Sequence, residues 1–170
     1  LYSAGYRHFY LPKGTYIVRN ITLGQGSVFY GDGKETIMKI PNSSSIIFPD
    51  LQCAVFALNQ PNITIKDLTV DGNRSNILFN NDPTQYQYEG IALDTGANYT
   101  TIENVYVTNT YNDGLDMDTV NNCIVRNSWF TSCGGHGIHL NGEGSGAYNC
   151  VNNIIDNCIV ESCGLNLSLI

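Results

Sequence analysis

Short runs of alternating hydrophobic and polar residues repeat along the chain. The run at residues 102–107 returns at residues 125–130, and the segment at residues 114–118 returns at residues 137–141. Both returns come after about 23 residues, a spacing typical of a solenoid whose coils bury their apolar face by stacking. Alternation with a period of two predicts β-strands. The pattern therefore predicts an all-β solenoid with coils of about 23 residues.

Further strand-forming runs precede and follow this repeat. The chain is expected to be a single β-helix domain over residues 1–170, incomplete at both ends and a fragment of a longer solenoid. The reason is that its last run stops inside a strand pattern, and an open coil would expose apolar side chains. These runs lie at residues 8–11, 15–18, 27–30, 36–40, 53–58, 63–70 and 155–160.

One column of Asn and Asp residues is expected at a corner of the coil. Asp67, Asn104, Asn127 and Asn157 follow equivalent apolar runs. Asn and Asp tolerate the left-handed backbone that a tight corner needs, and they can hydrogen-bond to nearby backbone groups. The column is therefore interpreted as structural.

Composition favours short strands and tight turns over helices. Charged residues make up 14% of the chain, and Gly and Asn, which suit turns, are frequent. The net charge of -7 argues against nucleic acid as a partner, because nucleic-acid binding needs a cluster of Lys and Arg. No apolar run approaches the ~20 residues of a membrane span.

Cysteines and glycosylation sequons indicate a secreted protein. The six cysteines include no Cys-x-x-Cys pair, which argues against a zinc cluster. Cys133 and Cys163 occupy equivalent places in successive coils and could pair or form an unbonded stack. The expected location is extracellular, on a cell surface or on a virion surface, and the protein is expected to be a glycoprotein. Sequons begin at Asn20, Asn42, Asn62, Asn73, Asn98 and Asn166.

Polar titratable residues occupy matching outward positions of the two repeated coils. Strand alternation sends Leu115 and Met117 inward, and Ile138 and Leu140 likewise. Stacking in register then places His136 beside Asp113, His139 beside Asp116 and Asn141 beside Asp118, with Glu89, Ala92 and Asp94 on the coil below. The candidate catalytic residues are Asp113, Asp116, His136 and His139, and the candidate substrate-binding residues are Glu89, Asp94, Asp118, Asn141 and Tyr111.

Groups stacked this closely are expected to shift one another's pKa values. Neighbouring carboxylates repel, so one would hold its proton near neutral pH, whereas a carboxylate favours the charged form of a nearby imidazole. Such opposed shifts suit acid–base chemistry on a glycoside. The alternative is a merely solvated polar face. No cofactor or metal is required, although the carboxylates could hold calcium.

Two insertions, at residues 71–89 and 141–150, are expected to form loops on one side of the solenoid. Loops of this kind commonly form the walls of a binding groove. Aromatic residues in and near them could stack on sugar rings, although turn and core tyrosines are common. These are Tyr86, Tyr88, Tyr111 and Tyr148.

Three turn-rich segments resemble right-handed parallel β-helix proteins that act on carbohydrates. They are residues 11–16 (Leu-Pro-Lys-Gly-Thr-Tyr), residues 31–37 (Gly-Asp-Gly-Lys-Glu-Thr-Ile) and residues 65–74. Their order and spacing are similar to the catalytic module of mannuronan C-5 epimerases and to related pectate-lyase-like proteins, including phage tailspikes. The resemblance implies a right-handed, single-stranded parallel β-helix and a function in acting on acidic glycans.

The resemblance reaches the candidate site only in part. Asp116 matches the Asp of the epimerase Asp-x-His segment, whereas Asp113 stands at the family's Tyr, Asp118 at its His and His136 at its second Asp. Residues 135–137 (Gly-His-Gly) are similar to a segment of polygalacturonases. Of the epimerase pattern, this site therefore matches Asp116 alone.

The sequence therefore predicts a protein that acts on polysaccharide as a lyase, an epimerase or a glycoside hydrolase-like enzyme. The competing interpretation is a non-catalytic glycan-binding or structural protein, such as a spike, fibre or filament, in which the β-helix is a rigid shaft. The expected partner is a polysaccharide. Open coil ends would also allow a homo-oligomer or end-to-end assembly.

Overall fold

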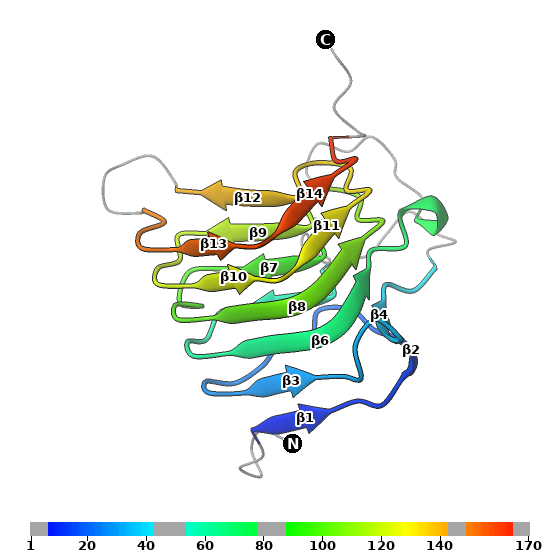
Figure 1. Cartoon of the computed structure of the whole chain (residues 1–170), viewed down its shortest axis with the longest axis horizontal. Coiled ribbons are helices and arrows are strands. Elements are labelled where there is room, and N and C mark those ends of the chain that lie inside the picture. Colours follow the sequence, from blue (N-terminus) through cyan, green and yellow to red (C-terminus); the bar gives the residue numbers. More distant parts are fainter. Residues whose placement is uncertain (1–6, 43–53, 78–87, 143–148, 165–170) are drawn as a thin grey trace.

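The computed structural model describes residues 7–42, 54–77, 88–142 and 149–164, and these residues form an all-β solenoid (Figure 1). Within them the only helical element is a 3-10 turn, Arg74–Asn76. Parallel strands stack coil on coil, which confirms the fold class predicted from the repeat. The strands are β1 (His8–Tyr10), β2 (Gly14–Ile17), β3 (Val28–Tyr30), β4 (Thr36–Lys39), β5 (Phe56–Leu58), β6 (Thr64–Asp71), β7 (Ile91–Leu93), β8 (Thr101–Thr108), β9 (Leu115–Asp118), β10 (Ile124–Arg126), β11 (Trp129–Thr131), β12 (Ile138–Asn141), β13 (Ile154–Asp156) and β14 (Ile159–Glu161).

The coils cross three faces. On the first face β1, β3, β6, β8, β10 and β13 pair in that order. On the second face β2 pairs with β4 and β11 with β14, and the C-terminal halves of the long strands β6 and β8 join them. The third face is the separate sheet β12-β9-β7-β5. Each strand meets the equivalent strand of a neighbouring coil, so the described pairings are parallel.

Coil length varies while the register is kept. Asp113 and His136 are 23 residues apart, and this coil length is the one predicted. Asn127 and Asn157 are 30 residues apart, and Asp67 and Asn104 are 37 apart, yet each pair occupies equivalent positions. The additional residues fall between strands, so they leave the pairing of the sheets unchanged.

Inward side chains form one continuous hydrophobic core. Ile65, Ile102 and Val125 are paired in register and fully buried. Leu115 and Met117 on the third face are also fully buried, as the alternation predicted. Fully burying an aliphatic side chain stabilises a fold by about 1.5–3 kcal/mol, so these columns hold neighbouring coils together.

The Asn and Asp column forms the predicted corner. The φ values of Asp67, Asn104, Asn127 and Asn157 lie between 47° and 56°, in the left-handed region. The side-chain amide of Asn104 donates to Asp67 Oδ1 at 2.7 Å, and that of Asn157 donates to Asn127 Oδ1 at 2.8 Å. Side-chain hydrogen bonds between coils therefore reinforce the corner.

The last described coil is more exposed than the coils before it. Ile154, Ile155, Ile159 and Val160 are between 45% and 54% exposed. Leu140, predicted to point into the core, pairs in register with the fully buried Met117 but is 44% exposed. The reason is that β12 is the edge strand of its sheet, with no described strand beyond it.

The described cysteines are free thiols, so a disulfide between Cys133 and Cys163 is not formed. Each donates to a carbonyl two residues earlier, Cys133 to Thr131 and Cys163 to Glu161, which confirms their equivalent places. Cys53 lies outside the described residues.

One sequon is inaccessible in the folded protein. Asn73 is 3% exposed, and its amide donates to the carbonyl of Ile40 and to Asn42 Oδ1, both at 2.9 Å. A glycan at Asn73 is therefore incompatible with this fold. Asn166 lies outside the described residues. Among the described residues no helix is long and apolar enough to cross a membrane.

Candidate functional site

Glu89, Asp113 and His136 each directly precede a glycine at the start of β7, β9 and β12. At these glycines the coils pack backbone against backbone. A Cβ on Gly114 would lie 2.6 Å from the carbonyl oxygen of Gly137. The N–H of Gly114 donates to the carbonyl of His136 at 2.9 Å. Because no side chain separates the coils here, the three titratable residues stack in one column, as predicted.

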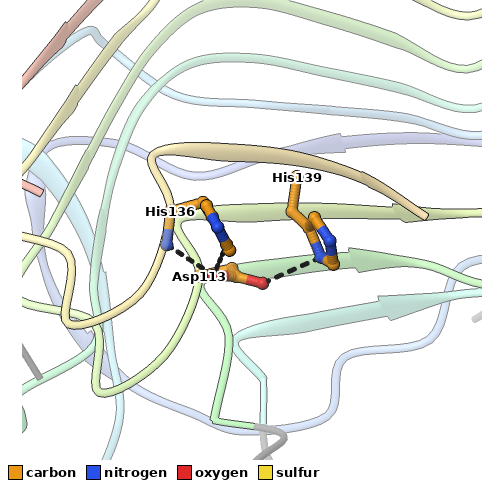
Figure 2. Close-up of side chains that lie close together, drawn as sticks. All are labelled: Asp113, His136 and His139. Atoms are coloured by element: carbon orange, nitrogen blue, oxygen red, sulfur yellow. Dashed lines mark hydrogen bonds and ion pairs between the residues drawn. The ribbon is translucent and has the colours of Figure 1, made fainter. Parts of the chain in front are cut away.

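Asp113 is a buried carboxylate that contacts both histidines (Figure 2). The backbone N–H of His136 donates to Asp113 Oδ1 at 2.6 Å, and Nδ1 of the same residue lies 3.1 Å from that oxygen. His139 Nδ1 lies 3.2 Å from Asp113 Oδ2. The two imidazole rings stack with centroids 4.7 Å apart. Asp113 is 4% exposed, so the carboxyl group that holds the two rings is itself buried.

His139 lies between two carboxylates. Its Nδ1 is 3.1 Å from Asp116 Oδ1 in addition to its contact with Asp113, and β12 pairs His139 with Asp116 in register. A ring nitrogen carries at most one proton. Asp116 Oδ1 is buried and has no hydrogen bond of good geometry among the described residues. The pairing of His139 with Asp116 was predicted, whereas the contact with Asp113 was not.

Burial raises the pKa of two carboxyl groups in this cluster. It raises the pKa of Glu89 to about 8, and the negative charge of Asp116 adds to the effect. It also raises the pKa of Asp116 to about 6, an effect that His139 opposes and that Asp113 and Asp118 strengthen. Glu89 is 3% exposed. At neutral pH Glu89 is therefore mostly protonated, in line with the expectation that one stacked carboxyl keeps its proton.

Three candidate substrate-binding residues lie further along the same face. Asp118 and Asn141 are paired in register by β9 and β12. Thr119 Oγ1 donates to Asp118 Oδ1 at 2.9 Å. Asp94 directly follows β7, and the register of β7 with β9 places it on the coil below Asp118. The cluster thus continues into a second polar column, as the stacking predicted.

Tyr111 is a partly buried side chain. It packs against the hydrophobic core and meets Tyr88 edge to face, with ring centroids 6.0 Å apart. Tyr88 is itself 6% exposed, so it does not offer a ring face to a sugar. Tyr86 and Tyr148, the other aromatic candidates of the loops, lie outside the described residues.

Two residues of the cluster were not identified from the sequence. Asn112 forms a side-chain hydrogen bond with Glu89. Gly135 leaves room for the Asp113 carboxylate, because a Cβ there would collide with Asp113 Oδ1 and lie 2.6 Å from Asn112 Oδ1. The glycine pair before His136 is the sequence feature that could have indicated the role of Gly135, since glycine allows close backbone approach.

Asp113, His136 and His139 could also hold a metal ion. Each offers one ligand atom, and these atoms lie within 4.8 Å of one another. Two imidazoles and one carboxylate suit zinc-like transition metals, whereas calcium takes oxygen ligands. The same atoms can instead exchange a proton among themselves.

Comparison with known proteins places this geometry in a family. The chain matches the family model described as "Rhamnogalacturonase A/epimerase, pectate lyase-like" over residues 5–166. A search of curated proteins found no match.

Solved structures with the same fold include polysaccharide-modifying proteins. The mannuronan C-5 epimerase AlgE4 A-module of Azotobacter vinelandii has a TM-score of 0.70 and 22% identity, covering 95% of this chain and 44% of that one. The AlgE6 A-module of that organism gives 0.65 and 18%, with coverages of 95% and 49%. An alginate lyase of Paenibacillus sp. str. FPU-7 gives 0.67 and 16%, with coverages of 93% and 52%.

The chain spans about half the length of these structures. Their likeness shows a shared fold, which agrees with the resemblance seen in the turn-rich segments. The match to the family model covers nearly the whole chain. The chain therefore belongs to the rhamnogalacturonase A/epimerase, pectate lyase-like family.

Proposed function

We propose that this chain is part of an extracellular enzyme that acts on an acidic polysaccharide by acid–base catalysis. In this proposal Asp116 is the base, His139 is its proton-transfer partner and His136 contacts the sugar. Asp113 holds both imidazoles in place. Asp94, Asp118 and Asn141 bind the neighbouring part of the glycan. The protonated carboxyl group of Glu89 supplies a neutral hydrogen-bond donor within the cluster.

One observation carries the proposal: a single imidazole nitrogen, His139 Nδ1, contacts two carboxylates of the neighbouring coil, Asp116 at 3.1 Å and Asp113 at 3.2 Å. A proton arriving at this group can be held by either carboxylate or by the ring. The pKa of Asp116, raised to about 6, lies near neutral pH. A general base works best with a pKa close to the working pH, and such a group contributes about 10²–10⁴-fold to a rate.

Exposure of the side chains supports the division of roles. The side chains of His136 and His139 are 56% and 37% exposed, whereas that of Asp113 is 5% exposed. A glycan can therefore touch the imidazoles and the 20% exposed side chain of Asp116, while Asp113 acts through the rings that it holds. The imidazoles can also donate N–H hydrogen bonds to the carboxylate of a uronate sugar.

The test compares products from polyuronates and neutral glycans. The purified protein is incubated with each glycan beside Asp116→Asn. Unsaturated ends indicate a lyase, new reducing ends a hydrolase, and exchange of the sugar C5 hydrogen with solvent without cleavage an epimerase. We expect one of these products with a polyuronate, and a loss of about 10²–10⁴-fold in the variant.

Asp156→Asn is the matched control, because Asp156 is an exposed carboxylate on β13, in the other sheet. It should leave turnover unchanged. Turnover that survives Asp116→Asn would place the catalytic site elsewhere. Binding of the glycan without any product would reject the enzyme in favour of a non-catalytic protein.

The alternative is a non-catalytic spike, fibre or filament protein that binds glycan or assembles end to end. The exposed apolar side chains of β13 and β14 favour it, because assembly would cover them. Its mark would be association that increases with protein concentration in sedimentation, without any glycan present.

A further inference from the structure

A second groove lies on the second face of the solenoid, in a different sheet from the Asp/His cluster. It has a volume of about 270 Å³ and follows the outer side of β8 and β11 across several coils. We call it the aromatic groove. The residues used below are Lys34, Asn104, Tyr106, Asn127, Trp129 and Asn157.

Two aromatic rings and one ammonium group form its floor. β8 and β11 pair Tyr106 with Trp129 in register, and the rings meet edge to face with centroids 5.9 Å apart. The Nζ of Lys34 lies 4.6 Å from the Tyr106 centroid and 4.8 Å from the Trp129 centroid. Trp129 Nε1 is a donor with no hydrogen-bond partner among the described residues. The rings therefore hold a cation at the groove, while the Trp129 N–H itself is buried.

Among the described residues that line this groove, Lys34 is the only charged one. It forms no ion pair with a carboxylate of the described residues, and it is exposed. The whole chain carries a net charge of -7, whereas the lining of the groove carries one cation and no carboxylate. An ammonium placed this way favours an anionic group over a neutral one.

A column of amides flanks the rings. Asn104, Asn127 and Asn157 are exposed corner residues of successive coils. Asn127 Oδ1 accepts from Asn157, and Nδ2 of Asn127 has no acceptor among the described residues. Coils recur at the ~4.8 Å strand spacing, so the same polar group is offered repeatedly along the groove. A repeating polar chain is the ligand that such a column matches.

We propose that the aromatic groove is an accessory binding site for an anionic polysaccharide chain of uronate sugars. A sugar ring packs against Tyr106 and Trp129, its carboxylate meets Lys34, and its hydroxyl groups bond to the amides. Aromatic faces, amides and one cation together recognise a uronate, since each group matches one part of that sugar. The site would hold the polymer at a distance from the Asp/His cluster and does not depend on turnover there.

The experiment measures binding of polygalacturonate and alginate, with dextran as the neutral probe, by affinity electrophoresis. All proteins carry Asp116→Asn, so the probes stay intact if the cluster is catalytic. We expect Lys34→Ala to weaken polyuronate binding by about twofold to fivefold, the upper range of one exposed charge contact. Binding of the parent should also weaken as salt is raised.

Lys13→Ala is the matched control, because it removes the same charge from an exposed position that does not line the groove. Asn127→Asp is the second variant: it keeps the size of the side chain and adds a negative charge. Asp is compatible with the corner, since Asp67 occupies the equivalent position with φ 56°. We expect Asn127→Asp to weaken polyuronate binding as well.

Each result decides the proposal. Weaker polyuronate binding in Lys34→Ala and Asn127→Asp, with Lys13→Ala unchanged, supports it. Equal effects of Lys34→Ala and Lys13→Ala, or unchanged binding in Asn127→Asp, overturn it. Dextran binding as strong as polyuronate binding overturns the choice of an anionic ligand. Failure here leaves turnover by the wild-type cluster unaffected, so the two proposals are tested separately.

Discussion

Single residues show how a buried carboxylate organises the cluster. Asp113 accepts a hydrogen bond from the backbone N–H of His136 and contacts both imidazoles. It is 4% exposed, so almost no water reaches it. A buried charge is tolerated when it is paired and hydrogen-bonded, and removing the charge leaves its partners unsatisfied. The orientation of His139 toward Asp116 therefore depends on Asp113.

The pH dependence of turnover tests Asp116 as the base. The base must be ionised, so kcat/KM should rise with pH and level off above about 6, the pKa to which burial raises Asp116. The Asp118 charge contributes to that shift. Asp118→Asn should therefore move the midpoint of the profile to lower pH. A midpoint that stays in place in Asp118→Asn would contradict this assignment.

Glu89 makes the stability of the fold depend on pH. Its pKa is about 8 in the fold against an ordinary value of 4.5, so the fold favours the protonated form. This stabilisation is complete below about pH 4.5 and is lost as the pH rises through about 8. Glu89→Gln cannot ionise, and above about pH 8 it should raise the free energy of unfolding by on the order of a few kcal/mol relative to wild type.

Urea unfolding near the two ends of this pH range measures the difference. Near pH 4.5 the Glu89→Gln variant and the wild type should have similar free energies of unfolding. Glu161→Gln, an exposed position on β14, is the control and should behave as wild type at both pH values. A constant difference between Glu89→Gln and wild type would show that ionisation of Glu89 is not the cause.

Residues of the cluster that stack in one column could be predicted from the sequence, whereas contacts between columns could not. The repeat aligns His139 with Asp116 and Asn141 with Asp118, and the register confirms both pairs. The second contact of His139, with Asp113, depends on side-chain rotation, which alternation does not specify. The depth of Glu89 likewise depends on packing around the coil rather than on its place in the repeat.

At the scale of elements, glycines set how closely β7, β9 and β12 approach. The backbone contact at Gly114 and the space at Gly135 are available only without a Cβ. Overpacking of a tight contact costs about 1–3 kcal/mol. The spacing between coils and the position of the Asp113 carboxylate therefore depend on the same short segments.

Gly135→Ala tests this dependence. Its Cβ would displace Asp113, so we expect both a loss of turnover and a destabilisation of about 1–3 kcal/mol. Gly31→Ala provides the comparison, because its Cβ would instead meet the Thr36 side chain at 2.5 Å on another face. It should destabilise the fold and leave turnover per folded molecule unchanged. Equal turnover in the two variants would show that Gly135 has no role in positioning Asp113.

Strand positions could be predicted where the repeat is uninterrupted. β8 with β10 and β9 with β12 follow the 23-residue spacing directly. Where a coil is longer than 23 residues, the repeat is harder to see in the sequence. There the Asn and Asp corner residues align one coil with the next, because their backbone conformation is itself repeated. Leu140 keeps the inward register of Met117 but stays 44% exposed, because burial requires a covering coil, which a strand pattern alone does not supply.

At the scale of the whole molecule, stability is expected to vary along the solenoid axis. Each coil of a solenoid contacts only its neighbours, and outer coils open more easily than inner ones. β8 pairs with β6, β10 and β11, whereas β13 and β14 each pair on one side among the described strands.

Hydrogen exchange measured by mass spectrometry tests this gradient. Peptides from β13 and β14 should take up deuterium severalfold faster than peptides from β8, because their amides open without breaking a second interface. Dilution of the protein should not change the ratio. Equal protection of the two regions would mean that the apolar side chains of β13 and β14 are covered in solution.

Unequal returns between coils separate the residues of the cluster from the residues that set coil length. Returns of 23, 30 and 37 residues meet the sheets at equivalent positions, so sequence can be added at a bend without moving a reactive group. Chemistry and substrate choice can then evolve in different segments. Grafting a bend from one relative to another should alter which sugar is accepted and leave the reaction type intact.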